Sequence, residues 1–270
     1  MKKQVLILMT LLAVMIFPVA AWAQGGNEFT IPLSDPAKRG KLKAKINYGS
    51  ITVKGTGRKD VLVRYTASND EDRGKSDSKD GLKRIGGGGM DLEAVENANT
   101  VSVKSDSWNN KLNLEIEIPS GMDLEVKTYN DGDLMISNIQ GQAALTNYNG
   151  EITALNISGT VVATTYNGGI KVTFDKVTEG TPMSYSTYNG DIDITFPSTV
   201  KASLKMKTEQ GDIYSGFDVD IKSSGPVQKK DTGSGVYKVV IDEWKRGDIN
   251  GGGPEFTMKN YNGDIILRKK

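Results

Sequence analysis

The sequence contains no cysteine and no histidine among its 270 residues. Without them the chain cannot form disulfides, build a Ser-His-Asp or Cys-His nucleophile, or bind zinc through thiolate or imidazole ligands. The chemistry that is left belongs to carboxylates, Lys, Arg and Tyr, and to metals bound through oxygen, such as calcium. We therefore expect stability to come from a packed core and a backbone ladder, and we expect no cofactor.

Long apolar runs are missing too, apart from one at the N-terminus. Lys2 and Lys3 precede an apolar run over residues 5–21, which ends in Ala21-Trp22-Ala23. A basic start, an apolar stretch and a small-x-small exit are typical of a secretory signal peptide, so we predict one over residues 1–23 and a single domain over residues 24–270. No later stretch is long enough to span a bilayer. We expect an exported protein that is periplasmic, on the cell surface or secreted, with no integral membrane segment after signal cleavage.

Neither sign of charge dominates. The chain has 34 Lys and Arg against 33 Asp and Glu, and removing Lys2 and Lys3 leaves 32 basic residues. Such a balance gives no overall field that would attract nucleic acid, so we expect no nucleic-acid partner. The closing Arg268-Lys269-Lys270 is predicted to be a solvated basic tail.

What the sequence does contain is a phrase close to Tyr-Asn-Gly-Asp-Ile, which recurs every 18 to 22 residues between Leu124 and Phe217. Two outlying copies extend it towards both ends of the chain, around Tyr48 and Tyr261. A repeat of this period is typical of a stacked or meandering β architecture. We expect the repeated glycines to form structural turns, because glycine adopts left-handed backbone conformations at low cost. They are Gly49, Gly132, Gly150, Gly168, Gly190, Gly211 and Gly263.

Apolar residues align in columns around these glycines. In the copy at Gly168 they are Val161 and Ala163 before the glycine and Ile170 and Val172 after it. The other copies place apolar residues at the same offsets, except for Ser215 after Gly211 and for Leu124 and Val126, which fit once the extra Asp131 is removed. The inward phase shifts by one residue across the glycine, which requires a turn or corner there. An antiparallel β-meander of Asn-Gly hairpins meets this requirement, and so does a single-stranded β-solenoid (β-helix) of about 18–22-residue coils. Periodicity alone does not choose between them.

Two stretches break the repeat. Residues 67–90 combine dense mixed charge with glycine, so we predict a mobile surface loop there. Residues 218–253 are less regular and contain one strong strand pattern at 236–241. Because no long amphipathic helix pattern occurs anywhere, the chain is predicted to be all-β.

A family resemblance rests on several phrases in a fixed order. They are Ile118-Pro119-Ser120-Gly121 with the strand after it, the Gly-Asp-Ile phrases, Phe196-Pro197-Ser198 and Gly251-Gly252-Gly253-Pro254. With them the chain resembles the putative adhesin family of β-strand-repeat domains of unknown function, found in exported bacterial proteins. Members of that family are similar to single-chain β-helices, so the resemblance implies the solenoid. It supplies no catalytic or binding residues that could be transferred to this sequence.

The repeated tyrosines form the candidate binding strip. In a solenoid Tyr148, Tyr166 and Tyr188 would stack, with Tyr129 and Tyr261 extending the row, and a neighbouring amide row would hold Asn149, Asn167 and Asn189. One interpretation is that both rows only stabilise the corner, through ring stacking and amide hydrogen bonds. The other is that the tyrosines bind sugar or protein, because the rings bury area while their hydroxyls stay hydrated.

The residue directly after the repeated glycine is usually acidic. Stacked carboxylates repel one another, so they need water, lysines such as Lys171, or a cation. Calcium is the candidate metal, because the available ligands are all oxygens. The acidic residues are Asp133, Glu151, Asp191, Asp212 and Asp264, of which the first four are the candidate metal ligands.

We expect an exported, non-enzymatic β-repeat protein, an adhesin or an envelope-associated structural or binding module. Its repetitive face would bind cell-envelope glycan or protein. One alternative is a carbohydrate-active β-helix enzyme, which would be favoured by a deep groove that gathers two carboxylates with an arginine. Another is a periplasmic module of a signalling or envelope-stress system.

Overall fold

The computed structural model describes residues 27–69, 78–79, 82–83, 91–222, 227–230, 237–240 and 244–270. The predicted signal peptide lies outside these residues, and so does most of the loop predicted over 67–90, whose first residues, Ala67 to Asn69, belong to strand β4. Every regular element in the described part of the chain is a β-strand, which confirms the all-β prediction. This part of the chain also holds no helix that could cross a membrane.

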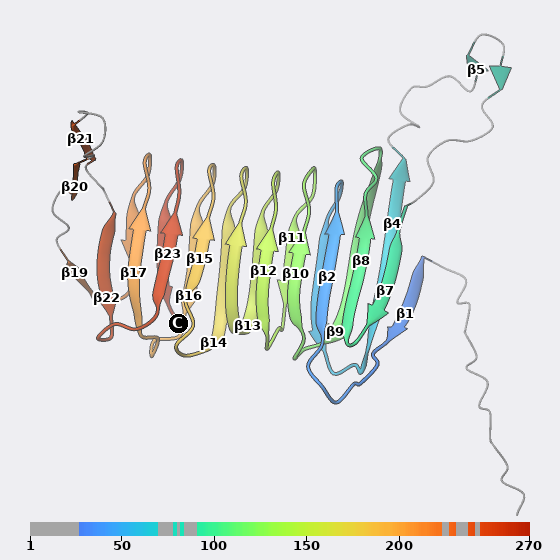
Figure 1. Ribbon diagram of the computed structural model, residues 1–270, viewed down its shortest axis with the longest axis horizontal. Coiled ribbons are helices and arrows are strands. Elements are labelled where there is room, and N and C mark those ends of the chain that lie inside the picture. The colour runs from blue at the N-terminus through green and yellow to red at the C-terminus, as the bar shows by residue number, and fades with distance from the viewer. Residues whose placement is uncertain are drawn as a thin grey trace, which may run out of the picture.

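One mixed sheet of 20 strands folds over so that two stacks of strands face each other across the core (Figure 1). Strand β13 runs through both stacks. In spatial order the first stack, sheet B, contains β7 (Glu93–Asn97), β8 (Thr100–Ser105), β2 (Lys41–Ile46), β10 (Asp123–Lys127), β12 (Gln142–Thr146), β13 (Ile152–Thr164), β15 (Met183–Ser186), β23 (Glu255–Lys259), β17 (Ala202–Lys207), β22 (Lys245–Ile249) and β19 (Val219–Lys222). Sheet A contains β1 (Glu28–Pro32), β4 (Asp60–Asn69), β9 (Asn110–Pro119), β3 (Ile51–Thr56), β11 (Leu134–Ser137), β13, β14 (Ile170–Val177), β16 (Ile192–Phe196), β24 (Ile265–Lys269) and β18 (Ile213–Ser215). Two separate two-stranded pairs are β5 (Ser78–Lys79) with β6 (Leu82–Lys83) and β20 (Val227–Lys230) with β21 (Tyr237–Val240).

Neighbouring repeats pair in parallel, and equivalent residues face each other. Val161 is in register with Ala143 in sheet B, and Ile170 is in register with Ile152 in sheet A. The alternative of an antiparallel meander is therefore wrong for these repeats, because an Asn-Gly hairpin would pair the two strands that flank its own glycine. Each repeat instead places one strand in each sheet and turns at its glycine, which is a solenoid-like arrangement.

The repeats do not stack in the order in which they occur in the sequence. The last repeat, β23 and β24, lies between β15 and β16 on one side and β17 and β18 on the other (Figure 1). At the other end, β2 and β3 lie between β8 and β9 and the β10–β11 repeat. The repeats β2–β3 and β23–β24 are thus both paired with strands on two sides.

The closing residues 268–270 are exposed, as the prediction of a solvated basic stretch requires, but they do not form a free tail. Arg268 belongs to β24 and its guanidinium contacts Asp193 at 2.8 Å, while Lys270 contacts Asp175 at 2.7 Å. Because β24 pairs with strands on both sides, the last residues of the chain lie against acidic neighbours in β14 and β16.

Antiparallel strands close both ends of the stack. Strands β1 and β4 cover β9 in sheet A, and β7 covers β8 in sheet B. At the far end β22 and β19 extend sheet B beyond β17. Both strands belong to residues 218–253, where the sequence pattern is less regular. Sheet A ends at the short strand β18. Ile213 and Ser215 were expected to face inward there, but Ile213 is half-buried and Ser215 is exposed.

The predicted apolar columns otherwise form the core. In the repeat at Gly168 the side chains of Val161, Ala163, Ile170 and Val172 are all buried, and equivalent positions of neighbouring repeats are buried with them. Phenylalanine rings also pack between repeats. The ring centroid of Phe196 lies 5.3 Å from that of Phe174 and 5.4 Å from that of Phe256. The hydrophobic effect on these columns and the parallel ladders together hold the two sheets in register.

The repeated glycines are required by close approach of the coils. A Cβ on Gly168 would lie on the carbonyl oxygen of Gly150, and its φ of +152° is a conformation that L side chains rarely adopt. Gly132 has no positive φ, yet a Cβ there would meet the carbonyl of Gly49. Close approach explains the repeated glycines from Gly132 to Gly263, since the backbone of each lies against the glycine of a neighbouring repeat, while Gly49 lies against Leu112.

Candidate functional site

Four of the five predicted tyrosines form one continuous stack along the glycine corners. Ring centroids are 5.1 Å apart for Tyr148 and Tyr166, 4.9 Å for Tyr166 and Tyr188, and 4.6 Å for Tyr188 and Tyr261. The planes of these pairs lie within 7° of parallel. Parallel, in-register repeats place the same residue of every coil about 4.8 Å from the next, which is the spacing that stacked rings need. We call these four residues the tyrosine row.

Tyr129 does not join this row. Its ring lies 6.1 Å from that of Trp108, tilted by 50°. The repeat at Tyr129 contains an extra residue, Asp131, which has a φ of +49° and shifts the corner. Trp108 is 58% exposed and lies outside the repeat, so the periodic pattern could not have identified it.

An unbroken asparagine row runs beside the tyrosine row. Asn149 Nδ2 donates to Asn130 Oδ1 at 2.9 Å, and Asn167 and Asn189 continue the chain, each donating to the preceding side chain at 2.7 Å. Asn262 adds a further 2.7 Å bond to Asn189. The predicted amide row is confirmed and extends by one residue at each end. Tyr48 occupies this row's register rather than that of the tyrosines, because it pairs with Asn130.

A third row, which the sequence reasoning missed, holds the glycine carbonyls. Thr165 Oγ1 donates to the carbonyl of Gly150 at 2.9 Å, and Thr187 Oγ1 donates to that of Gly168 at 2.8 Å. Thr128, Asn147, Asn260 and Thr208 make the equivalent bond in their repeats. The signal was present in the sequence, since all but one of these repeats have Thr or Asn three residues before the glycine, and the shifted Thr128 repeat has it four before.

The tyrosine row exposes ring edges and hydroxyls rather than ring faces. The four side chains are between 38% and 50% exposed, but each inner ring is covered on both faces by its neighbours. Partial burial raises the pKa of the Tyr188 hydroxyl, and the neighbouring Tyr261 and Tyr166 raise it further. The Tyr188 hydroxyl therefore stays protonated, and a protonated hydroxyl can both donate and accept hydrogen bonds.

The acidic row follows the glycines on the sheet A side of the corner. Carboxylates there accept hydrogen bonds from the backbone of the next repeat: Asp133 from Glu151 N, Asp191 from Asp264 N, and Asp264 from Asp212 N, each at 2.8 Å. Gly169 interrupts the row and leaves a hollow of about 340 Å³ beside Glu151, Lys171 and Asp191. No group of three acidic side chains converges on one point in the described ranges, and calcium binding by Asp133, Glu151, Asp191 and Asp212 stays a prediction.

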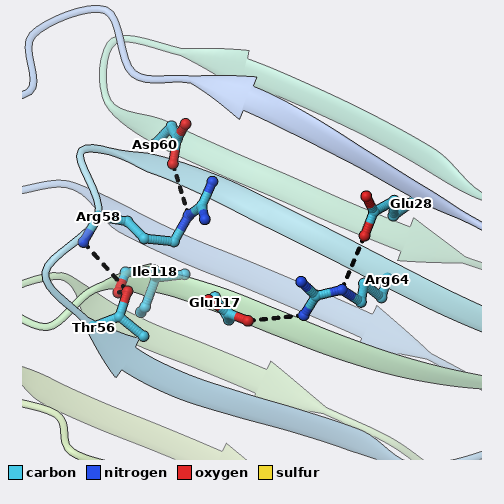
Figure 2. A network of polar contacts seen from close by, with 7 residues as sticks. All are labelled: Glu28, Thr56, Arg58, Asp60, Arg64, Glu117 and Ile118. Atoms are coloured by element: carbon cyan, nitrogen blue, oxygen red, sulfur yellow. Dashed lines mark hydrogen bonds and ion pairs between the residues drawn. The ribbon is translucent and has the colours of Figure 1, made fainter. Parts of the chain in front are cut away.

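Two carboxylates do meet an arginine at the N-terminal end of sheet A. Arg64 Nε contacts Glu28 at 2.9 Å and its Nη1 contacts Glu117 at 2.8 Å, joining β1, β4 and β9 (Figure 2). The hydrogen bond from Arg64 lowers the pKa of Glu117, so this carboxylate is held ionised. A glycosidase needs one carboxyl whose pKa is raised enough to donate a proton, and the contact of Glu117 with Arg64 does the opposite. The cluster ties the antiparallel end strands together.

A pocket with a volume of about 420 Å³ lies at the other edge of the sheets. It is lined by the turns that follow β14 and β16 and by Gly252, Gly253 and Pro254 ahead of β23. Of its two acidic lining residues, Asp175 and Glu179, the first is paired with Lys270 at 2.7 Å. The pocket does not adjoin the tyrosine row.

Comparison with known proteins identifies the family of the chain. Residues 30–250 match the family described as Toastrack DUF4097. Among solved structures, a protein from Clostridium sporogenes described as a putative cell adhesion protein has a TM-score of 0.49 and 12% sequence identity, with 90% of this chain and 99% of that chain covered. No curated protein matches the chain.

Proposed function

Because the chain belongs to the Toastrack DUF4097 family, a family of unknown function, we propose from its surface that it is an exported, non-enzymatic module that binds at the cell envelope. In this proposal it is a single-stranded β-solenoid of about 18–22-residue coils that presents a repetitive face. The face is an adhesive or structural surface for envelope glycan or protein, and the tyrosine row is its centre.

The tyrosine row carries this proposal. Its four phenol groups are exposed at regular intervals of 4.6 to 5.1 Å, on a backbone that the asparagine row and the glycine contacts hold rigid. Such a surface is prepared before binding, so little conformational entropy is lost when a repetitive partner docks. Tyrosine is also a residue that interfaces favour, because it combines apolar area with a hydroxyl.

A binding role fits the polar chemistry better than catalysis does. The carboxylates beside Arg64 are ion-paired, and three members of the acidic row, Asp133, Asp191 and Asp264, accept backbone hydrogen bonds. A catalytic carboxylate pair needs one member whose pKa is raised and both members facing a substrate cleft. The tyrosine row, in contrast, is aligned, repeated and open to solvent.

The test is capture of envelope material by the full chain. Tyr148→Ser, Tyr166→Ser and Tyr188→Ser together should abolish capture from solubilised envelope while the melting transition remains cooperative. The matched control replaces three exposed side chains on sheet A, Met135, Leu155 and Tyr214, by serine. Equal capture by wild type and the tyrosine variant, or loss in the control alone, would refute the tyrosine row as the binding strip.

A further inference from the structure

Although the chain is nearly neutral overall, the two sides of the glycine corner, one in sheet A and one in sheet B, carry charges of opposite sign. On the sheet A side stands the acidic row of Asp133, Glu151, Asp191, Asp264 and Asp212. On the sheet B side stands a different row, whose members precede the tyrosine by two residues in the repeats that have one, as Thr146 precedes Tyr148. Its side chains lie on the outward face of sheet B, because alternate residues of a strand point the same way. We call it the lysine row.

The lysine row is basic at both ends and neutral in the middle. Lys104, Lys45 and Lys127 are in direct register at one end, on β8, β2 and β10. Lys259 and Lys207 are in direct register at the other, on β23 and β17. Each set places like charges about 4.8 Å apart, which costs free energy unless counter-charges or a ligand offset the repulsion.

Between these ends the same row carries only small polar side chains. Thr146, Thr164 and Ser186 connect Lys127 to Lys259 through consecutive registers. The parallel row one step further from the corner has Lys43 at one end and Lys205 at the other, with Glu125, Ala144, Val162, Ser184 and Thr257 between them. From β12 to β15 both rows are therefore uncharged and rich in hydroxyls.

Counter-charges inside the protein account for only part of the basic residues. Lys104, Lys45, Lys127 and Lys207 have carboxylate partners between 2.8 and 3.0 Å away. Lys43 and Lys259 are exposed and have no carboxylate partner among the described residues. Glu125, in register with Lys43, is already held by Lys127 and Lys41.

Protection of sheet edges does not explain these lysines either. Lysine on an edge strand discourages pairing with another chain. Lys43 lies on β2 and Lys259 on β23, and both strands are paired on two sides. Their ammonium groups are therefore available to a partner rather than needed at an edge.

We propose that the outward face of sheet B binds a linear acidic glycan laid along the stack, which gives a ligand class to the envelope-binding function on which this inference rests. The lysines at each end would contact the anionic groups of the chain. Thr146, Thr164, Ser186 and the tyrosine hydroxyls would exchange hydrogen bonds with its sugar hydroxyls. One coil per 4.8 Å presents the same groups repeatedly, which suits a polymer of repeating units.

Two other anionic partners fit this face less well. Single-stranded nucleic acid is usually held by bases stacked on aromatic faces, and the inner faces of the tyrosine row are already covered by one another. An anionic membrane is usually held by inserted apolar side chains in addition to lysines. Val162 is the exposed large apolar side chain in the middle of this face.

The experiment measures binding of the full chain to polygalacturonate and, in a parallel arm, to a phosphodiester-linked glycopolymer. The test variant combines Lys43→Ser and Lys259→Ser, since serine already occupies both rows at Ser184 and Ser186. The control variant removes the same charge from the outward face of sheet A by Lys54→Ser and Lys171→Thr, which copy their register partners Ser137 and Thr153. Binding should weaken about tenfold in the test variant, stay unchanged in the control, and fall as salt rises.

Each other outcome overturns the inference. Equal weakening in both variants would mean a nonspecific charge effect. Equal binding by wild type and the test variant would exclude the outward face of sheet B as the binding surface. Tighter binding of a single-stranded oligonucleotide or of phosphatidylglycerol vesicles would replace the glycan by another partner class. Failure of both polymers, while envelope capture through the tyrosines persists, would overturn the acidic-glycan inference and leave the proposed function standing.

Discussion

Tyr261 stacks on Tyr188 with ring centroids 4.6 Å apart, although the repeat that follows Tyr188 in the sequence is the one at residues 202–215. The last repeat therefore enters the stack between two earlier ones. This arrangement completes the tyrosine row with a fourth ring and gives the last strand, β24, a partner strand on each side.

Truncating Phe256 to alanine should destabilise the whole domain. The Phe256 side chain is fully buried and stacks on Phe196 at 5.4 Å, so the free energy of unfolding should fall by about 3–5 kcal/mol. Denaturant unfolding measures this loss. Tyr214→Ala, at a 52% exposed position on the edge strand β18, is the control and should change stability little. Equal effects would mean that the last repeat is only an appendage.

Replacing Thr187 by valine should reveal the energetic role of the row that holds the glycine carbonyls. The Thr187 hydroxyl is buried and donates to the Gly168 carbonyl, and isosteric valine leaves that carbonyl without this donor. The expected loss is about 1–2 kcal/mol in thermal or denaturant unfolding. Thr164→Val, an exposed position in the lysine row, should be nearly neutral. A neutral Thr187 variant would show that the bond adds nothing to the corner.

Acid should weaken the fold partly through Glu125. Hydrogen bonds from Lys127 and then from Lys41 lower its pKa from 4.5 to about 2. Because the folded pKa lies below the ordinary value, the stabilisation is complete above about pH 4.5 and is lost as pH falls towards 2. Glu125→Gln should remove this part of the pH dependence, about 1 kcal/mol for a partly exposed pair, in melting curves between pH 5 and pH 2. Unchanged slopes would argue that the pair contributes nothing in solution.

The Asn-Gly steps of the corners should resist deamidation in the folded protein. Deamidation requires the glycine nitrogen to attack the asparagine side-chain carbonyl, with loss of ammonia and hydrolysis of the cyclic imide. At Asn167-Gly168 the glycine N–H donates to the Asn189 carbonyl at 2.8 Å, and both side-chain atoms of Asn167 are engaged in the asparagine row.

Asn250-Gly251 provides the internal comparison, since its Gly251 N–H makes no hydrogen bond within the described residues. Peptide mass spectrometry after incubation at mildly alkaline pH should find deamidation first at Asn250, and at all Asn-Gly steps alike once the chain is unfolded. Early modification at Asn167 in the folded protein would contradict the rigid corner.

The sequence repeat predicts which residues form the core, but it does not predict the order in which the coils stack. Offsets from each glycine correctly predicted buried residues such as Val161 and Ile170, because inward positions in every coil need apolar side chains. The order could not be predicted, since the repeats resemble one another and β23 can pair with any strand of the same pattern. What selects its place is packing between specific rings, such as Phe256 against Phe196, which periodicity does not encode.

The candidate site was predicted in part for the same reason. The rows of Tyr148, Tyr166 and Tyr188 and of their asparagines follow from equal spacing. Tyr129 departs because a single extra residue, Asp131, changes the corner, and its contact with Trp108 depends on a turn outside the repeat. The lysine row was hidden because its members lie far apart in sequence and meet only after the coils are stacked in their actual order.

Lysine footprinting of the wild-type chain locates the glycan-binding face without any mutation. Acetylation rates would be measured by mass spectrometry with and without captured envelope glycan. The account predicts that bound glycan slows labelling of Lys43 and Lys259 on sheet B and leaves Lys54 and Lys171 on sheet A unchanged. Protection of Lys54 and Lys171 with no change at Lys43 and Lys259 would contradict it.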